Sequence, residues 1–217
     1  MAADKYDRQL VVALLDGPGD TITPQQAANL NAKQREAPVP SEAVVLGAGA
    51  AAAADDAALR RAIHGEGEVP LPVSARSRLY LLGRGDWRRQ MLSGWTAEQV
   101  ADLLARCGLT AARVVSVVAD ELGRDSASVA AGDLREPPDS FAARLHASLA
   151  RSHGIETELL ARVYPTAVVG EGPARGTKRT LDVADAAAGG VHHRPRSKLR
   201  FTWRDGLQRR DWSDEEK

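Results

Sequence analysis

The sequence predicts an α/β fold in which a mostly parallel central sheet is covered by helices on both faces. Two observations predict it. Short, mostly apolar runs that end in turn residues alternate along the chain with segments of helical periodicity, which is typical of buried parallel strands between helices. The hydrophobic fraction of 43% supports a substantial core, and 217 residues can form one sizeable α/β domain. We therefore expect one domain over residues 1–203, followed by a charged flexible tail over residues 204–217.

Apolar and β-branched runs predict the strands of this sheet. The first run, QLVVALL at residues 9–15, is closed by the turn sequence DGPGD. The runs at 78–82 and 112–118 each stop at a polar turn that contains glycine, and we expect them to be adjacent, parallel strands. The other predictions are strands at 43–46, 158–163 and 198–203, and a hairpin over 167–182.

Capping residues and apolar spacing predict four helices. Thr23 followed by Pro24 indicates a helix that continues to residue 34, because proline is favoured at the first helical position. Thr96 and Gln99 fit a capping box that opens a second helix. The other predicted helices are 56–63 and a helix from Asp139 or Ser140 to about residue 152, while 47–56 fits either a flexible loop or a helix start.

The balance of charge argues against a general nucleic-acid-coating protein. The chain has 29 Lys and Arg residues against 29 Asp and Glu residues, although basic residues outnumber acidic ones between positions 162 and 210. Cys107 is the single cysteine, which excludes an internal disulfide and a cysteine-rich zinc site. Residues 1–8 lack the apolar core of a signal peptide, and no run approaches the roughly 20 apolar residues of a membrane span.

Several segments, taken in order, resemble one family of bacterial toxin domains. They are KYDRQLVV at 5–12, AANLNAK at 27–33, LSGWTAEQ at 92–99 and KLRFTW at 198–203. With them the chain resembles the inositol-hexakisphosphate-induced cysteine protease domain of multifunctional-autoprocessing RTX toxins and, more distantly, that of clostridial glucosylating toxins. The resemblance implies a caspase-like sandwich with a mostly parallel central sheet, helices on both faces and a C-terminal β-hairpin flap.

The same resemblance implies a domain that stays inactive until it binds inositol hexakisphosphate in a eukaryotic host. Binding orders the flap, and a Cys–His dyad then cuts the toxin after a leucine. The resemblance places the catalytic histidine at Arg84 and the catalytic cysteine at Asp120, and neither residue type is present there. Arg84 cannot act as a base because its guanidinium stays protonated, and Asp120 attacks a peptide carbonyl far less readily than a thiolate. We therefore expect a degenerate dyad and no catalytic residue.

The sequence offers no replacement for this dyad. Cys107 falls on the apolar face of a predicted helix, where a buried, inert thiol is expected. His192 and His193 have no neighbouring carboxylate or cysteine, so we expect no metal site. The opposite charges of Arg84 and Asp120 at facing strand ends predict that these side chains pair, directly or through one water. The alternative is two independent surface residues.

Basic residues toward the C-terminus predict an anion site. Inositol hexakisphosphate is a compact polyanion, so its receptor needs several converging Lys and Arg side chains, with bidentate arginine favoured. The resemblance places the ligand-binding residues at Lys33, Arg162, Lys178, Arg179 and Lys198, with Arg175 and Arg200 as supplements. Gln34 departs from the family, which tends to have a histidine there. The alternative is a basic, solvated face of an arginine-rich protein.

Three functions remain open at the level of sequence. The first is a catalytically inactive relative of the toxin protease that binds inositol hexakisphosphate or an unidentified protein partner. The second is an active autoprocessing cysteine peptidase, or another hydrolase, with a rebuilt site. The third is a structural interaction module without a ligand. The resemblance implies a bacterial effector or toxin component, without a classical signal peptide, that could be delivered into a host cytosol.

Overall fold

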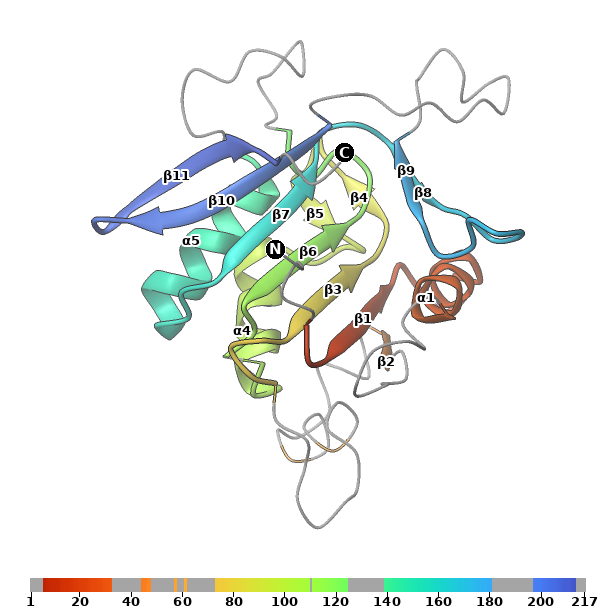
Figure 1. Ribbon diagram of the computed structural model, residues 1–217, viewed down its shortest axis with the longest axis horizontal. Helices are drawn as coiled ribbons and strands as arrows, with labels where there is room; N and C mark the ends of the chain where they lie inside the picture. The colour runs from red at the N-terminus through yellow and green to blue at the C-terminus, as the bar shows by residue number, and fades with distance from the viewer. Residues whose placement is uncertain are drawn as a thin grey trace.

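The computed structural model describes residues 6–32, 44–47, 57, 61, 73–109, 111–124, 139–180 and 197–213. Its centre is a seven-stranded mixed sheet with the strand order β11-β10-β7-β6-β3-β1-β2 (Figure 1). The strands are β1 (Gln9–Leu15), β2 (Val44–Gly47), β3 (Arg78–Leu82), β6 (Val114–Val118), β7 (Glu158–Arg162), β10 (Lys198–Arg204) and β11 (Leu207–Trp212). The first five run parallel, whereas β10 and β11 are antiparallel to their neighbours. The prediction that β3 and β6 are adjacent and parallel is confirmed.

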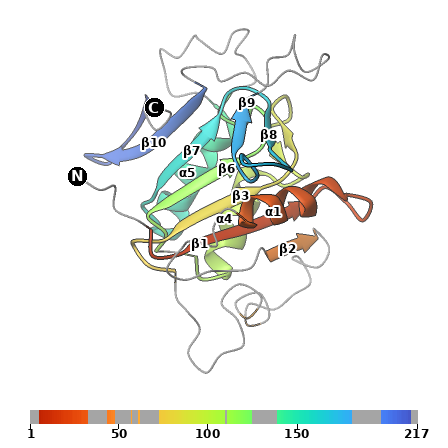
Figure 2. The same cartoon turned by 45° about the vertical axis from the view of Figure 1, so that its right-hand side comes forward.

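Helices cover both faces of the sheet, as the sequence predicts. Helices α4 (Ala97–Arg106) and α5 (Phe141–His153) pack together on one face. On the other face, α1 (Ile22–Ala32) lies beside the hairpin of β8 (Thr166–Val168) and β9 (Lys178–Thr180), which falls on the predicted hairpin segment (Figure 2). Among the described residues, no helix is long and apolar enough to cross a membrane.

The parallel strands are mostly apolar because both faces of the sheet are largely buried. In β1, Leu10, Val12 and Leu14 join the large core that contains α4 and α5. Val11 and Ala13 point the other way and join the smaller core under α1. Successive side chains of a strand point to opposite faces, so burial on both sides requires an unbroken apolar run.

The predicted caps of α4 at Thr96 and of α5 at Ser140 are confirmed. The start of α1 differs from the prediction. The helix begins at Ile22, and Asp20 caps it by accepting hydrogen bonds from the first backbone N–H groups, while Thr23 is buried within the first turn. Aspartate caps helices at least as well as threonine does. The predicted start, with Pro24 as the first helical residue, differs from the observed start at Ile22 by two residues.

The charged C-terminal segment is not a tail over its whole length. Residues 207–212 form β11, which pairs in register with β10 at the edge of the sheet, so the predicted division at residue 204 is wrong. A second unpredicted feature is a small hairpin of β4 (Gly85–Asp86) and β5 (Met91–Leu92) after β3. The predicted loop at 47–56 and helix at 56–63 lie outside the described residues, apart from positions 47, 57 and 61.

Candidate functional sites

The carboxyl ends of β1, β3 and β6 converge on a cleft of about 710 Å³. Parallel strands end at one edge of the sheet, which is where α/β sheets usually bind ligands. The polar lining comes from Asp16 and Asp20 after β1, Arg84 after β3, Asp120 after β6 and Thr166 in β8. Both positions that the toxin resemblance assigns to the dyad therefore line the same cleft.

Two glycines allow these strand ends to approach one another. A β-carbon at Gly83 would lie 2.6 Å from the Ser93 hydroxyl and 3.2 Å from the Leu14 carbonyl oxygen. A β-carbon at Gly85 would lie 2.9 Å from the backbone nitrogen of Asp120, and closer still to its carbonyl oxygen. A side chain at either position would therefore force neighbouring groups to move, and at Gly85 the group that must move is backbone.

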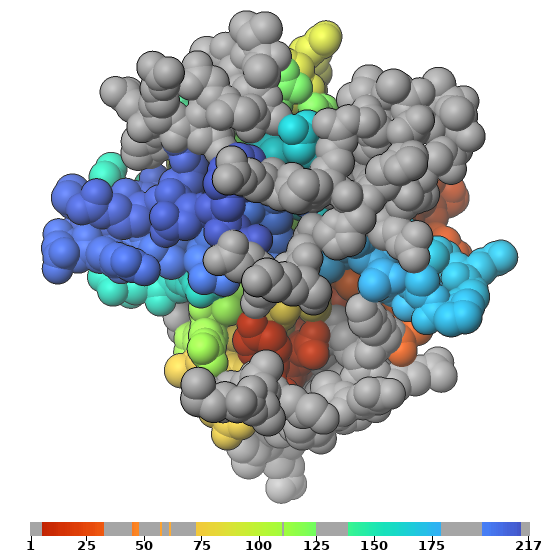
Figure 3. Space-filling model, turned by 45° about the horizontal axis from the view of Figure 1, so that its top comes forward, coloured from red at the N-terminus to blue at the C-terminus, as the bar shows by residue number. Residues whose placement is uncertain are grey.

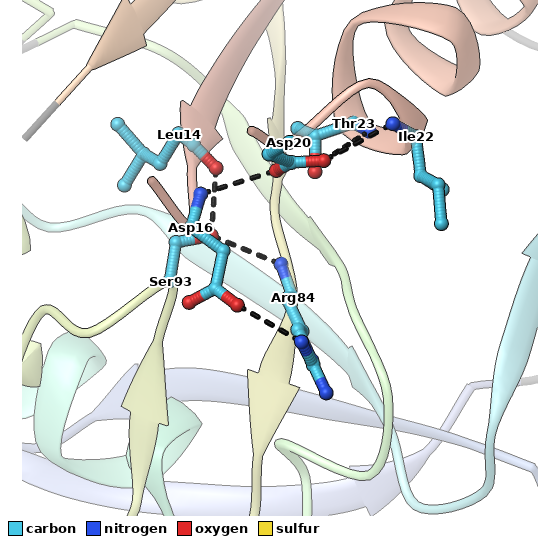
Figure 4. Close-up of polar contacts among 7 residues, drawn as sticks. All are labelled: Leu14, Asp16, Asp20, Ile22, Thr23, Arg84 and Ser93. Atoms are coloured by element: carbon cyan, nitrogen blue, oxygen red, sulfur yellow. Dashed lines mark hydrogen bonds and ion pairs between the residues drawn. The ribbon is translucent and has the colours of Figure 1, made fainter. Parts of the chain in front are cut away.

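Arg84 pairs with Asp16, so the predicted direct pair between Arg84 and Asp120 is wrong. Nη1 of Arg84 donates to Oδ2 of Asp16 at 3.1 Å, and the Arg84 side chain is 76% exposed (Figure 4). The Arg84 backbone N–H donates to Oγ of Ser93 at 3.0 Å, and that hydroxyl donates to the Leu14 carbonyl oxygen at 2.6 Å. Ser93 thus ties the ends of β1 and β3 together, and Arg84 reaches toward β1.

Asp120 forms its hydrogen bond with the β8–β9 hairpin. Its Oδ1 accepts the backbone N–H of Thr166 at 2.7 Å, and the residue is half-buried. Burial raises the pKa of Asp120, and the Thr166 N–H and the charge of Arg84 oppose this shift without reversing it. The cleft therefore contains a carboxylate whose negative charge is only partly compensated.

Asp20 has a structural role in the same cleft. Its Oδ1 accepts the backbone N–H groups of Ile22 at 3.1 Å and Thr23 at 3.0 Å, and its Oδ2 accepts that of Asp16 at 3.1 Å (Figure 4). Burial acts to raise the pKa of Asp20, but hydrogen bonds from Thr23, Asp16 and Ile22 lower it overall. This carboxylate is already saturated by backbone donors and holds the start of α1 against the end of β1.

Within the described residues that line it, the cleft has no imidazole or thiol. Cys107 is fully buried at the end of α4, as predicted, and His146 is fully buried against Trp203 of β10. In the part of the chain that the structure describes, no group of three or more His, Cys, Asp and Glu residues could hold a metal ion. His192 and His193 lie outside that part.

Cations gather on the sheet face that carries α1 and the β8–β9 hairpin. On β7 and β10, every second side chain belongs to the core with α4 and α5, namely Leu159, Ala161, Leu199 and Phe201. The side chains that alternate with them, which include Arg162, Lys198 and Arg200, therefore point to the opposite face of the sheet. Lys178 reaches the same face from the hairpin, with its Nζ 4.2 Å from the ring centroid of the buried Tyr80. We call this surface the basic face; it comprises Arg78, Arg162, Lys178, Lys198 and Arg200.

Arg162 and Lys198 form the centre of the basic face. They are directly paired residues on the antiparallel strands β7 and β10, and they are only 6% and 7% exposed. Nη1 of Arg162 donates to Oγ of Ser197 at 3.0 Å, and Nε of Arg200 lies 3.1 Å from Oε1 of Glu158. Two cationic side chains are therefore adjacent and buried at the centre of this face.

The dimensions of the basic face follow from the order of the strands. Tyr80 on β3, beneath Lys178, lies two strands away from β7, which is about 10 Å across the sheet at the usual strand spacing. In the register of the sheet Tyr80 is level with Leu160, so Arg162 lies a further two residues, or roughly 7 Å, along β7. Lys198 lies one strand further. In the space-filling view, the β8–β9 hairpin in light blue and the β10–β11 pair in dark blue lie on opposite sides of the molecule (Figure 3).

The other predicted anion-binding residues have mixed outcomes. Arg175 has a structural contact, because its Nε donates to Oδ1 of Asn29 at 3.1 Å and ties the hairpin to α1. Arg179 lies in β9, but its side chain is outside the described part of the structure, as is the whole of Lys33. The described members of the predicted set, Arg162, Lys178 and Lys198, share one face of the sheet.

The sequence analysis missed three residues that shape these surfaces, Asp16, Ser93 and Tyr80. The turn DGPGD carries a usable signal for Asp16, since polar residues directly after a buried strand lie at the edge where ligands bind. Ser93 has no such signal, because its hydroxyl contacts Leu14, 79 positions away in the chain. Tyr80 is indistinguishable in sequence from its apolar neighbours in β3.

Comparison with known families finds no matching family model, and no curated protein is significantly similar to the chain. Functional inference therefore depends on the cleft and the basic face, together with the motif resemblance described above.

Proposed function

We propose that the protein is a non-catalytic, protease-like module that binds inositol hexakisphosphate, or a polyanion of similar charge density, on its basic face. The observation that carries this proposal is the burial of Arg162 and Lys198 side by side on neighbouring strands. The resemblance to the inositol-hexakisphosphate-induced toxin protease domain supports it, as does the hairpin beside the sheet. A caspase-like identity of the sandwich and a role as a bacterial effector in a host cytosol belong to the same proposal.

Burying two like charges next to each other costs free energy. Arg162 and Lys198 repel each other across paired strand positions, and both have lost most of their hydration. A polyanion bound over this face would offset part of the repulsion, and the half-buried Lys178 can donate a charge-assisted hydrogen bond to it. Lys178 extends the positive surface onto a hairpin, so one ligand could contact the hairpin and the sheet together.

The proposal excludes catalysis because of what lies at the two dyad positions. Arg84 pairs with Asp16, and Asp120 accepts the Thr166 N–H, so neither supplies a neutral base or a thiolate. A cysteine peptidase with a relocated nucleophile would need Cys107, which is 0% exposed. Incubation of the purified chain with inositol hexakisphosphate is expected to produce no self-cleavage on denaturing gels.

The decisive experiment is a thermal-unfolding titration with inositol hexakisphosphate. At a concentration 100 times the Kd, binding to the native state adds about 2.7 kcal/mol, or about 5–10 °C in Tm for a chain of this size. Unphosphorylated inositol and equimolar inorganic phosphate are expected to have little effect, because neither presents several phosphates together. The shift should shrink as salt increases.

A charge reversal tests the location of the ligand. Lys178→Glu is expected to weaken binding by at least about ten-fold, since it removes one charge-assisted contact and adds a repulsion. Arg89→Glu is the matched control, because its side chain is 80% exposed and contacts Asp86 rather than the basic face. A Tm that does not change at millimolar ligand, or equal losses in both variants, would contradict the proposal.

A further inference from the structure

The cleft at the strand ends has a charge pattern opposite to that of the basic face. Its three carboxylates differ in what they already bind. Asp20 accepts three backbone N–H groups, and Asp16 pairs with Arg84. Among the described residues, Asp120 receives one hydrogen bond, from the Thr166 N–H to Oδ1. Asp120 is therefore the carboxylate of the described lining that has neither an ion pair nor saturation by backbone donors.

Apolar groups adjoin Asp120 in the cleft. Val118 and Ala119 come directly before it, line the cleft and are buried, while Ile22 lines the cleft at 68% exposed. A long side chain with an apolar stem and a cationic head fits this lining, because the stem covers apolar surface while the head reaches the carboxylate. At about 710 Å³ the cleft can hold the stem, the head and adjoining backbone of a polypeptide.

An anion suits this cleft less well. Arg84 is the cation of the described lining, and its guanidinium is already paired with Asp16 at 3.1 Å. An anion that displaced Asp16 from Arg84 would leave the Asp16 carboxylate without its ion pair, and it would also lie close to the negative charge of Asp120. A bound cation, in contrast, would compensate the charge of Asp120 and leave the pair of Arg84 and Asp16 intact.

Short contacts hold the cleft in shape before any ligand arrives. The Ser93 hydroxyl joins the ends of β1 and β3, and Gly85 packs directly on the backbone of Asp120. Glu121, the next residue, has a φ of 53° and an ion pair with Arg124 at 2.9 Å. A preformed site loses less entropy when it binds, which favours measurable affinity from few contacts.

We propose that this cleft binds an arginine side chain of a polypeptide partner, with the guanidinium against the Asp120 carboxylate. Arginine is preferred to lysine because its planar fork donates two parallel N–H bonds to one carboxylate. Oδ2 of Asp120 and the second lone pair of Oδ1 accept them, while Thr166 keeps its own bond. This inference is independent of polyanion binding, because it concerns a different surface.

The test is a titration of the full chain, followed by fluorescence polarisation, with a labelled, end-blocked peptide that contains one arginine. The probe for comparison is the same peptide with citrulline, which has nearly the same shape and no charge. The arginine peptide is expected to bind at least about ten-fold more tightly than the citrulline peptide. A lysine peptide is expected to fall between them.

Two variants of the cleft give opposite expectations. Asp120→Asn should lower affinity for the arginine peptide by at least about ten-fold, and its side-chain oxygen can still accept the Thr166 N–H, which protects the fold. Arg84→Ala should raise affinity, because it removes a competing cation and frees Asp16. Asp102→Asn on α4, with its side chain 64% exposed, is the matched control.

Several results would overturn the inference. They are equal binding of the arginine and citrulline peptides, no binding of either at millimolar concentration, or an Asp120→Asn variant that binds normally. Weaker binding of the arginine peptide to Arg84→Ala would also contradict the inference, because removing a cation from the cleft should favour a cationic ligand. Lys178→Glu should leave peptide binding unchanged, and Asp120→Asn should leave the thermal shift with inositol hexakisphosphate unchanged, so the two proposals fail separately.

Discussion

Acid is expected to destabilise the protein through one buried histidine, His146 in α5. The ring is fully buried and stacks on Trp203, with centroids 5.3 Å apart and an interplanar angle of 17°. Its Nδ1 lies 2.8 Å from Nε2 of Gln208, and its Nε2 lies 2.9 Å from the Thr157 carbonyl oxygen. An amide nitrogen only donates and a carbonyl only accepts, so these contacts fit the neutral ring protonated at Nε2.

The magnitude follows from the pKa of this ring. Burial lowers the pKa of His146 from 6.5 to about 4, although the hydrogen bond with Thr157 opposes the shift. Between these two values the unfolded chain binds a proton that the folded chain does not, so the free energy of unfolding falls as the pH falls. The slope is about 1.4 kcal/mol per pH unit, which amounts to about 2 kcal/mol at pH 5 and roughly 3 kcal/mol below pH 4.

The assay compares urea unfolding of the wild type and His146→Gln at pH 7, 6 and 5. At pH 7 the variant is expected to be less stable by about 1–3 kcal/mol, because it loses the stacked ring and a buried hydrogen bond. The deficit should shrink by about 2 kcal/mol at pH 5, since glutamine does not titrate and the other ionisable groups are common to both proteins. A deficit that stays constant from pH 7 to pH 5 would refute the reasoning.

Two further predictions concern the backbone around the cleft. Asp20→Ala is expected to lower the free energy of unfolding by about 1 kcal/mol at pH 7, because the backbone N–H groups of Ile22 and Thr23 lose their capping acceptor. Asp20→Asn is the control, since its side-chain oxygen can still accept these bonds. Equal losses of stability in both variants would contradict this interpretation. Gly85→Ala is expected to lower the free energy of unfolding by about 1–3 kcal/mol, because the new methyl group overlaps the backbone of Asp120. Gly19→Ala is the control, since a β-carbon there meets nothing within 4 Å and the residue does not have a positive φ; a Gly85→Ala variant as stable as Gly19→Ala would exclude the clash.

The central strands could be predicted because their physics is local. A strand buried on both faces needs apolar side chains on both, and β1, β3, β6 and β7 each contain consecutive buried apolar residues, interrupted in β6 by the buried Ser116. The capping box at Thr96 is equally local, since its two hydrogen bonds link residues three positions apart. Such signals require no knowledge of the rest of the fold.

Strand β11 could not be predicted from its own residues. It is an edge strand whose side chains alternate between exposed and half-buried, so charged residues are tolerated along its whole length. The strand forms because β10 offers an antiparallel partner, with Arg200 opposite Asp211 and Thr202 opposite Arg209. That pairing depends on a neighbour and a turn, and the composition of 204–217 alone resembles a solvated tail.

The two surfaces differ in how far the sequence could define them. The Arg162 and Lys198 positions could be selected from the resemblance, but their contact depends on the register between β7 and β10. The partner of Arg84 could not be selected, because Asp16 and Asp120 both follow parallel strands next to β3 and both are within reach of a long side chain. In the structure Arg84 pairs with Asp16, and Ser93 accepts the Arg84 backbone N–H; no sequence pattern reveals either contact.

The chain has no net charge, but the fold places its charged residues on separate surfaces. Cations collect on the sheet face around Arg162 and Lys198, while the least compensated carboxylate, Asp120, lies in the cleft at the strand ends. A catalytic dyad needs a base and a nucleophile that reach each other, whereas Arg84 and Asp120 are each held by a different neighbour. Under the two proposals, the cationic side chain and the polyanion bind to separate surfaces of opposite charge, and a variant that weakens one interaction leaves the other unchanged.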